Sequence, residues 1–184
     1  MKKYNLGDLL HLSPPPPPPP PPTHSNGLET YVQNGLVNNK DSAAKYVQHM
    51  LQYNMKYNDG AFVCLAYDAC ASNSMDDLVL LDQECSALKA PREIRTASQK
   101  LGLRLLKIFK RKIQSPFLEE YERKIKDGEV NSHYCIVFGM IAQLRGIPKR
   151  EGLYAYYYNA AVGMVTNSVK LVPLGQLDGQ DIIF

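Results

Sequence analysis

Apolar residues recur at helical spacing along nearly the whole chain after Asn26, and this periodicity most limits the possible folds. Residues three and four apart share one face of an α-helix, whereas a half-buried strand alternates apolar and polar residues. No segment alternates long enough to indicate a sheet, and no unit of about 20–50 residues repeats. The sequence therefore predicts an all-α fold, a single-domain helical bundle of about eight or nine helices.

Start and stop signals delimit the expected helices. Asp41 is expected to cap one helix. A strongly apolar helix over residues 133–145 should end at Gly146, because glycine readily adopts the left-handed conformation that follows many helices. The last full helix is expected over residues 151–170, and Val172-Pro173 should stop it because proline cannot continue a helix.

The segment after Pro91 is expected to form a helix with one apolar face. That face comprises Ile94, Ala97, Leu101, Leu105 and Ile108. A basic cluster overlaps the same segment and consists of Lys100, Arg104, Lys107, Lys110, Arg111 and Lys112. Two interpretations of the cluster remain, a solvated helix face and a surface for an acidic partner protein. The aromatics and glycine-rich loops typical of nucleic-acid sites are missing, so no nucleic-acid partner is expected.

Residues 14–22 are nine consecutive prolines. Each fixes φ and lacks an N–H, so this tract cannot be a helix or a central strand. A polyproline II rod of about 28 Å is expected. The tract could be a ligand for aromatic-lined grooves in a polyproline-presenting adaptor, a stiff spacer, or an engineered substitution. We therefore expect an N-terminal helix and polyproline tract over residues 1–22, followed by a helical domain over residues 23–184.

Composition restricts the class of protein. The 184 residues carry a formal net charge of +3, too small to indicate a nucleic-acid partner by itself. The four cysteines form no CxxC motif, and such spacing is typical of reduced thiols in a cytosolic protein. No secretory signal and no run of about 18–20 apolar residues is present. A cytoplasmic location without a membrane partner is therefore expected.

Catalytic motifs are absent from the sequence. It has no P-loop, no GxSxG, no HExxH and no GxGxxG after a strand. The acidic pairs, such as Glu119 and Glu120, fall at expected helix starts, where the helix dipole favours negative charge. The sequence thus predicts a non-enzymatic protein with no catalytic residue, no metal site and no cofactor.

Histidine and cysteine leave one alternative open. Imidazole and thiolate suit nickel or zinc, so His24, His133 and Cys135 could belong to a helical metal-binding protein. Residues two apart diverge on a helix, however, which favours a capping His133 and a buried Cys135. His24 could contact a metal or a partner, or make a local hydrogen bond.

The tyrosines near residue 156 also carry two interpretations. Tyr154, Tyr156, Tyr157 and Tyr158 cannot all face one core from one helix. Exposed tyrosine is typical of interface anchors, so interface and core positions are both expected among them.

Four blocks of sequence resemble UreF-type urease accessory proteins, in the same order and at similar spacing. They are residues 23–33, residues 92–102, residues 133–146 and residues 154–180. The last block contains Asn-Ser-Val-Lys-Leu-Val-Pro-Leu-Gly-Gln-Leu-Asp-Gly-Gln over residues 167–180. Together the blocks span the chain from Thr23 onward.

The resemblance implies an all-α, non-enzymatic scaffold in urease maturation. Proteins of this family form dimers, bind the accessory protein UreD/UreH and recruit the nickel-carrying GTPase UreG. The assembly delivers nickel to apo-urease. Motif matching places Tyr158 and Lys170 on the GTPase-facing surface, and Tyr154, Gln176 and His24 are further partner-binding candidates.

The chain departs from the family pattern in three places. The family usually has an Asp-x-x-Phe-Pro-x-Gly-type motif before Thr23, where this chain has the proline tract. It usually has a basic residue at the position of Tyr154. Family members also continue beyond the position of Phe184, so the resemblance implies a C-terminally truncated domain.

Overall fold

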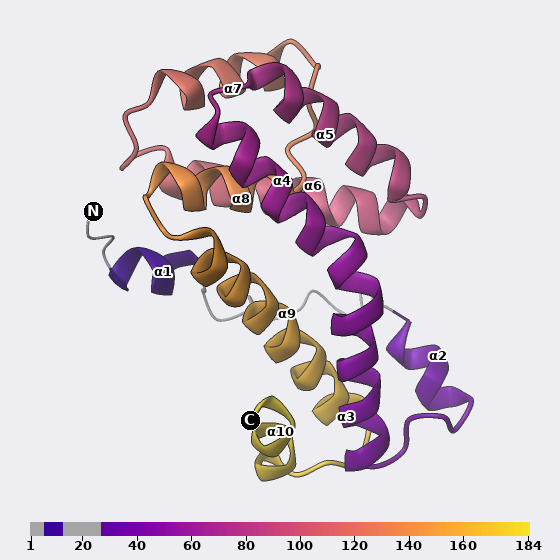
Figure 1. Ribbon diagram of the computed structural model, residues 1–184. Helices are drawn as coiled ribbons and strands as arrows, with labels where there is room; N and C mark the ends of the chain where they lie inside the picture. Colours follow the sequence, from indigo (N-terminus) through magenta and orange to yellow (C-terminus); the bar gives the residue numbers. More distant parts are fainter. Residues whose placement is uncertain (1–5, 13–26) are drawn as a thin grey trace. The chain divides into compact units, whose positions relative to one another are not determined.

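The computed structural model describes residues 6–12 and 27–184 (Figure 1). The described residues form helices and contain no strand. The α-helices are α1 (Leu6–Leu12), α2 (Leu28–Gln33), α3 (Lys40–His49), α4 (Asp59–Ala71), α5 (Met75–Leu88), α6 (Arg92–Phe109), α7 (Pro116–Lys126), α8 (Tyr134–Leu144), α9 (Lys149–Leu171) and α10 (Gln176–Ile183). A π-helical segment, η1 (Met50–Met55), follows α3. The predicted all-α class is confirmed.

Internal contacts divide the chain into two compact units. Unit 1 contains α1, α4 to α8 and the start of α9. Unit 2 contains α2, α3, η1, the rest of α9 and α10. The divisions fall after Tyr57 and after Tyr156. The predicted division at residue 22 and the proline tract lie outside the described residues, so both stay predictions.

Helix α8 forms the centre of unit 1. All its residues from Cys135 to Ala142 are buried, as its apolar sequence predicts. It packs against α4 and α6. Gly139 permits the close approach to α4, because a Cβ atom there would lie 2.3 Å from the carbonyl oxygen of Val63. The packing of α4 on α8 therefore depends on the absence of a side chain at Gly139.

The loop before α8 makes a second close approach. A Cβ atom on Gly102 of α6 would lie 1.8 Å from the carbonyl oxygen of Ser132. Ser132 has a φ of 60°, a left-handed conformation that is uncommon for a residue with a side chain. The loop is thus held tightly against α6, and this places the start of α8.

The face that α6 buries is not the apolar face that periodicity identifies. Its buried residues are Gly102, Leu105, Leu106 and Phe109. Ile94, Leu101 and Ile108, which share the predicted apolar face, are 42%, 41% and 50% exposed, so most of that face lies outside the core. Contact with α8 and the Ser132 loop selects the glycine-containing face, because only that face allows the backbones to approach closely.

Helix termini follow the predicted chemistry with one correction. Gly146 has a φ of 69° just after α8, as the stop signal predicts, and α9 ends before Pro173. The cap of α3 is Asn39 rather than Asp41. The Asn39 side chain accepts a hydrogen bond from the backbone N–H of Ser42. Asp41 lies in the first helical turn instead, where the dipole favours its charge.

Unit 2 has its own apolar core. The fully or nearly buried members include Leu28, Tyr46, Val47, Met164 and Val165. Helices α3 and α10 lie side by side (Figure 1), and the Lys40 ammonium donates to the Asp181 carboxylate at 2.5 Å. These contacts hold the last helix of the chain on α3.

No helix among residues 6–12 and 27–184 is long and apolar enough to cross a membrane.

Candidate functional site

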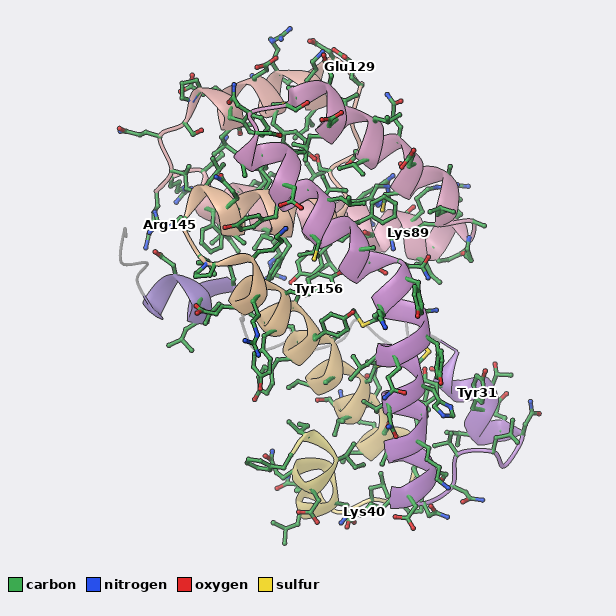
Figure 2. All side chains as sticks on the ribbon, in the orientation of Figure 1. Tyr31, Lys40, Lys89, Glu129, Arg145 and Tyr156 are labelled. Carbon is green, nitrogen blue, oxygen red and sulfur yellow. The ribbon has the colours of Figure 1, made fainter. Side chains whose placement is uncertain are left out.

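The tyrosine run at the start of α9 divides between surface and core. Tyr156, labelled in Figure 2, is 5% exposed, stacks on Tyr134 and meets Phe138 edge to face. Tyr154 of unit 1 and Tyr158 of unit 2 are 72% and 46% exposed. Tyr156 is therefore a core residue, while Tyr154 and Tyr158 present phenol rings to solvent.

Lys170 and Gln176 lie on either side of a tight connection in unit 2. Lys170 is in the last turn of α9, and Gln176 is the first residue of α10. The backbone N–H of Leu174 donates to the carbonyl of Val172 at 2.7 Å, which reverses the chain immediately after α9. Both side chains are exposed. The connection between α9 and α10 thus presents a cation and an amide on the surface of unit 2.

Local hydrogen bonds fix this connection. The Asp178 carboxylate accepts from the backbone N–H of Gly175 at 2.9 Å, which caps the start of α10. A Cβ atom on Gly179 would lie 2.9 Å from the Val169 side chain, so α10 packs closely on the end of α9. Lys170 and Gln176 therefore lie at the two ends of a connection whose backbone is fixed by hydrogen bonds and close packing.

The three predicted residues of unit 2 have no structural partner in the described part of the chain. The side chains of Tyr158, Lys170 and Gln176 make no hydrogen bond or ion pair with residues 6–12 or 27–184. Lys170 also lies where the helix dipole favours a cation. Their exposure leaves them available to a partner protein. His24 lies outside the described residues, so its predicted contact stays a prediction.

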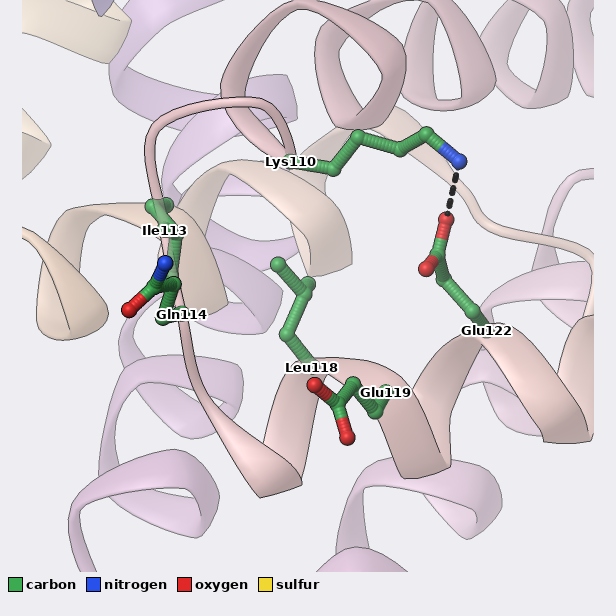
Figure 3. Close-up of a pocket in the computed structure, with 6 residues that line it drawn as sticks. All are labelled: Lys110, Ile113, Gln114, Leu118, Glu119 and Glu122. Carbon is green, nitrogen blue, oxygen red and sulfur yellow. Dashed lines mark hydrogen bonds and ion pairs between the residues drawn. The ribbon is translucent and has the colours of Figure 1, made fainter.

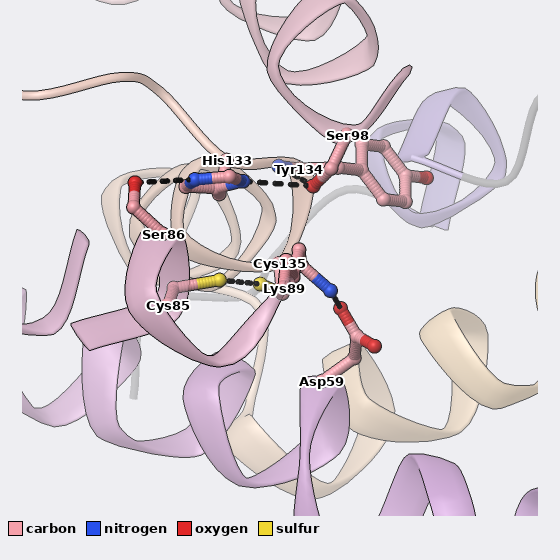
Figure 4. Close-up of polar contacts among 8 residues, drawn as sticks. All are labelled: Asp59, Cys85, Ser86, Lys89, Ser98, His133, Tyr134 and Cys135. Atoms are coloured by element: carbon pink, nitrogen blue, oxygen red, sulfur yellow. Dashed lines mark hydrogen bonds and ion pairs between the residues drawn. The ribbon is translucent and has the colours of Figure 1, made fainter. Parts of the chain in front are cut away.

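The His133 cluster in unit 1 is a buried structural network (Figure 4). The His133 ring is fully buried, and its Nε2 and Nδ1 atoms lie 2.7 Å and 3.2 Å from the hydroxyls of Ser86 and Ser98. Asp82 accepts hydrogen bonds from the backbone N–H groups of Asn131 and His133 at 2.5 Å and 3.1 Å. The cluster thus ties α5 and α6 to the loop before α8.

Burial determines the ionisation of this cluster. Loss of solvent lowers the pKa of His133 below its usual range, although the nearby Asp82 carboxylate acts in the opposite direction. Both ring nitrogens already have hydrogen-bonding partners. The predicted side-chain cap is absent, because His133 makes no side-chain bond to the first turn of α8. A neutral, positioned imidazole is the state that this geometry favours.

The cysteines are free thiols. Cys85 and Cys135 are fully buried, with their sulfur atoms 3.5 Å apart. The hydrogen bond with Cys85, together with burial, raises the pKa of Cys135 well above its usual range. Burial likewise raises the pKa of Cys70 to about 12. Among the described residues, no three His, Cys, Asp or Glu side chains lie close enough to hold a metal ion.

The basic cluster is only partly engaged in ion pairs. Lys110 forms an ion pair with Glu122 of α7 at 2.9 Å. The two side chains line a hollow of about 300 Å³ (Figure 3), and its other lining residues are Ile113, Gln114, Leu118 and Glu119. Lys100, Arg104 and Lys107 are exposed and form no ion pair within the described chain. The hollow is open and combines charges of both signs, so it indicates no particular ligand.

Three exposed tyrosines of unit 2 were not predicted from the sequence. Tyr53 and Tyr57 are 66% and 67% exposed, and Tyr31 is 47% exposed. Tyr31 also lines a second hollow of about 300 Å³, together with Leu36, Val37, Ser42, Lys45, Tyr46, His49 and Met50. The spacing of Tyr53 and Tyr57 was a usable signal, because residues four apart share a helix face. The π-helical geometry of η1 gives no comparable sequence signal.

Comparison with known proteins identifies the relatives of the chain. The family model described as UreF matches residues 37–184. A urease accessory protein UreF of Actinobacillus pleuropneumoniae serotype 5b (strain L20) is 54% identical over 179 residues, which cover 97% of this chain and 79% of the relative. The protein of the same name from Haemophilus influenzae (strain ATCC 51907 / DSM 11121 / KW20 / Rd) is 50% identical over 180 residues, covering 98% and 77%. That from Lachnoclostridium phytofermentans is 34% identical over 176 residues, covering 96% and 77%.

Proposed function

The chain belongs to the UreF family, and on that premise we propose that it is a urease accessory protein, a scaffold that acts in urease maturation. It bridges UreD/UreH and the GTPase UreG, and the assembly inserts nickel into apo-urease. It works in the cytoplasm as a homodimer and catalyses no reaction itself. The observation that carries the proposal is the 54% identity to a urease accessory protein over 97% of the chain.

The surface of unit 2 supports a protein-binding role. Tyr158, Lys170 and Gln176 are exposed and have no partner that would explain them structurally. Tyrosine is enriched at protein interfaces, and an exposed lysine can supply charge complementarity to an acidic partner surface. Tyr158 and Lys170 are the proposed contacts for UreG, while Tyr154, Gln176 and His24 are proposed to contact the other members of the assembly.

The buried network in unit 1 supports a scaffold better than a metal-binding protein. His133 and Cys135 are buried, and each already has hydrogen-bonding partners. A metal ion would have to displace those contacts. Nickel is accordingly the cargo of the assembly, and this protein contributes binding surfaces.

Co-purification tests the proposal directly. The chain is immobilised and mixed with purified UreD/UreH and UreG, with Lys170→Glu and Tyr158→Ala compared with the unchanged protein. Lys170→Glu reverses an exposed charge, so a loss of UreG of about tenfold or more is expected, with UreD/UreH retained. Lys126→Glu is the matched control, because Lys126 is exposed and forms no ion pair in the described chain. Equal UreG retention by Lys170→Glu and Lys126→Glu would contradict the proposed contact.

A further inference from the structure

Helix α6 carries an apolar line on its solvent side. Ile94, Leu101 and Ile108 are seven residues apart, which is close to two helical turns, so they form a row along the helix. The row is about 21 Å long, at ~1.5 Å per residue. Each side chain is between 41% and 50% exposed. Three large aliphatic side chains at regular spacing are thus about half exposed to solvent.

The buried face of α6 is already occupied by a different set of residues. Gly102, Leu105, Leu106 and Phe109 pack inside unit 1, and Gly102 touches the backbone at Ser132. The exposed row is therefore a second apolar face rather than the edge of an unfilled core.

Unpaired cations flank this row. Arg104 lies three residues after Leu101 and four before Ile108, so it borders both on the helix surface. Lys100 directly precedes Leu101, and Lys107 directly precedes Ile108. Lys100, Arg104 and Lys107 are exposed and form no ion pair within the described chain. The acidic residue of α6 is Glu93, in the first turn, where the dipole favours it. The outer face of α6 thus combines an apolar row with uncompensated positive charge.

This pattern fits one class of partner. An apolar row with a seven-residue period is complementary to a helix that carries aliphatic residues at the same period, and flanking cations favour acidic residues beside them. A nucleic-acid site would combine the cations with stacking aromatics, which this face lacks. A membrane-surface helix would present a broader apolar face with bulky anchors. An acidic amphipathic helix is therefore the occupant that the face favours.

We propose that the outer face of α6 binds an acidic amphipathic helix of a partner protein, with Ile94, Leu101 and Ile108 against its apolar side and Lys100, Arg104 and Lys107 against its carboxylates. This proposal involves other residues than the proposed UreG contact and does not depend on it. The contact is small, at the low end of protein interfaces below about 1,200 Å², so it is a weak and salt-sensitive one.

Fluorescence anisotropy with designed peptides tests the proposal on the full chain. The probe is a labelled helical peptide of about 20 residues with leucines at seven-residue spacing and flanking glutamates. A second peptide carries lysines in place of the glutamates. The acidic peptide should bind at least about tenfold more tightly than the basic one, and binding should weaken as salt rises. Equal affinity for the two peptides overturns the proposal.

Variants locate the contact on α6. The triple variant Lys100→Glu, Arg104→Glu, Lys107→Glu should lose at least about tenfold in affinity, and Leu101→Ser with Ile108→Ser should lose a similar factor. The control reverses three exposed cations elsewhere, Lys45→Glu, Lys126→Glu and Arg150→Glu, and should keep most of the binding. Circular dichroism verifies that every variant is folded. Equal losses in the control and the α6 variant overturn the proposal.

Two further measurements exclude other occupants. Vesicles of phosphatidylcholine with phosphatidylserine should not retain the protein more than phosphatidylcholine alone, and retention that depends on Lys100, Arg104 and Lys107 would assign the face to a membrane. Sedimentation should give the same oligomeric state for the unchanged chain and for the double variant Leu101→Ser, Ile108→Ser. Dissociation caused by that variant would assign the face to a second copy of this chain. Either result overturns the proposal.

Discussion

At the scale of single residues, His133 connects buried structure to pH. The folded protein holds its imidazole neutral, because burial lowers its pKa, while the unfolded chain has the usual pKa of about 6.5. Below that value the unfolded state binds more protons than the folded state, so the contribution of His133 to stability is present above it and is lost as pH falls.

Denaturant unfolding between about pH 7.5 and pH 5 checks this prediction. The free energy of unfolding of the unchanged protein should fall relative to that of His133→Gln by at most ~1.4 kcal/mol per pH unit. Glutamine cannot take up a proton in this range but retains hydrogen-bonding capacity. Parallel pH dependences of the two proteins would contradict the prediction, because His133 would then have the same pKa in the folded and the unfolded state.

The cysteines give a second prediction at this scale. Cys64 is partly exposed, whereas Cys85 and Cys135 have no accessible surface. Only the thiolate reacts readily with iodoacetamide, and the raised pKa of Cys135 suppresses that form further. Mass spectrometry after timed alkylation of the native protein should find Cys64 modified well before Cys85 and Cys135. Simultaneous modification of the three under native conditions would contradict the buried placement.

At the scale of helices, Gly139 controls the crossing of α4 and α8. A methyl group there would lie too close to the carbonyl of Val63, and a backbone atom cannot move aside cheaply. Gly139→Ala should lower the free energy of unfolding by about 1–3 kcal/mol, measured by urea denaturation.

Gly163 of α9 supplies the matched control. A Cβ atom at Gly163 meets nothing within 4 Å, so Gly163→Ala should raise stability by about 0.5–1 kcal/mol through helix propensity alone. The two variants make the same chemical change, and opposite signs are expected. A stabilising Gly139→Ala would contradict the close packing of α4 on α8.

Helix boundaries were more predictable than helix faces. Helix α8 ends before Gly146, because glycine readily adopts the left-handed conformation seen there, and α9 ends before Pro173, whose ring cannot continue a helix. Both constraints are local in the sequence. The sequence placed Ile94, Leu101 and Ile108 on one apolar face of α6, but it did not show that this face is largely exposed. Periodicity finds an apolar row there, but a contact remote in sequence, between Gly102 and Ser132, selects which row is buried.

The candidate site shows the same limit. The sequence indicated that the tyrosines near residue 156 divide between core and surface, but it did not say how. Tyr156 is buried because Tyr134 and Phe138 of α8 lie against it, and that contact joins residues of two different helices, α8 and α9. The roles proposed for Tyr158 and Lys170 rest on the resemblance to a family, since exposure and charge alone fit many surfaces.

At the scale of the whole molecule, the candidate residues differ in burial between the two units. Unit 1 buries His133 and the Cys85–Cys135 pair, whereas unit 2 exposes Tyr158 on α9, and Lys170 and Gln176 beside the connection of α9 to α10. Such a division suits a scaffold that is bound by other proteins. Its contribution to urease maturation is therefore expected to be sensitive to exposed residues that stability measurements barely register.

The nickel content of urease tests this account most directly. Cells that express urease and its accessory proteins without their own UreF receive this chain, Lys170→Glu or the Lys126→Glu control, and the purified urease is measured for nickel and activity. The chain and the control should restore nickel loading, and Lys170→Glu should leave urease largely without nickel while remaining folded. Nickel loading that is unaffected by Lys170→Glu, or that the unchanged chain fails to restore, would contradict the account.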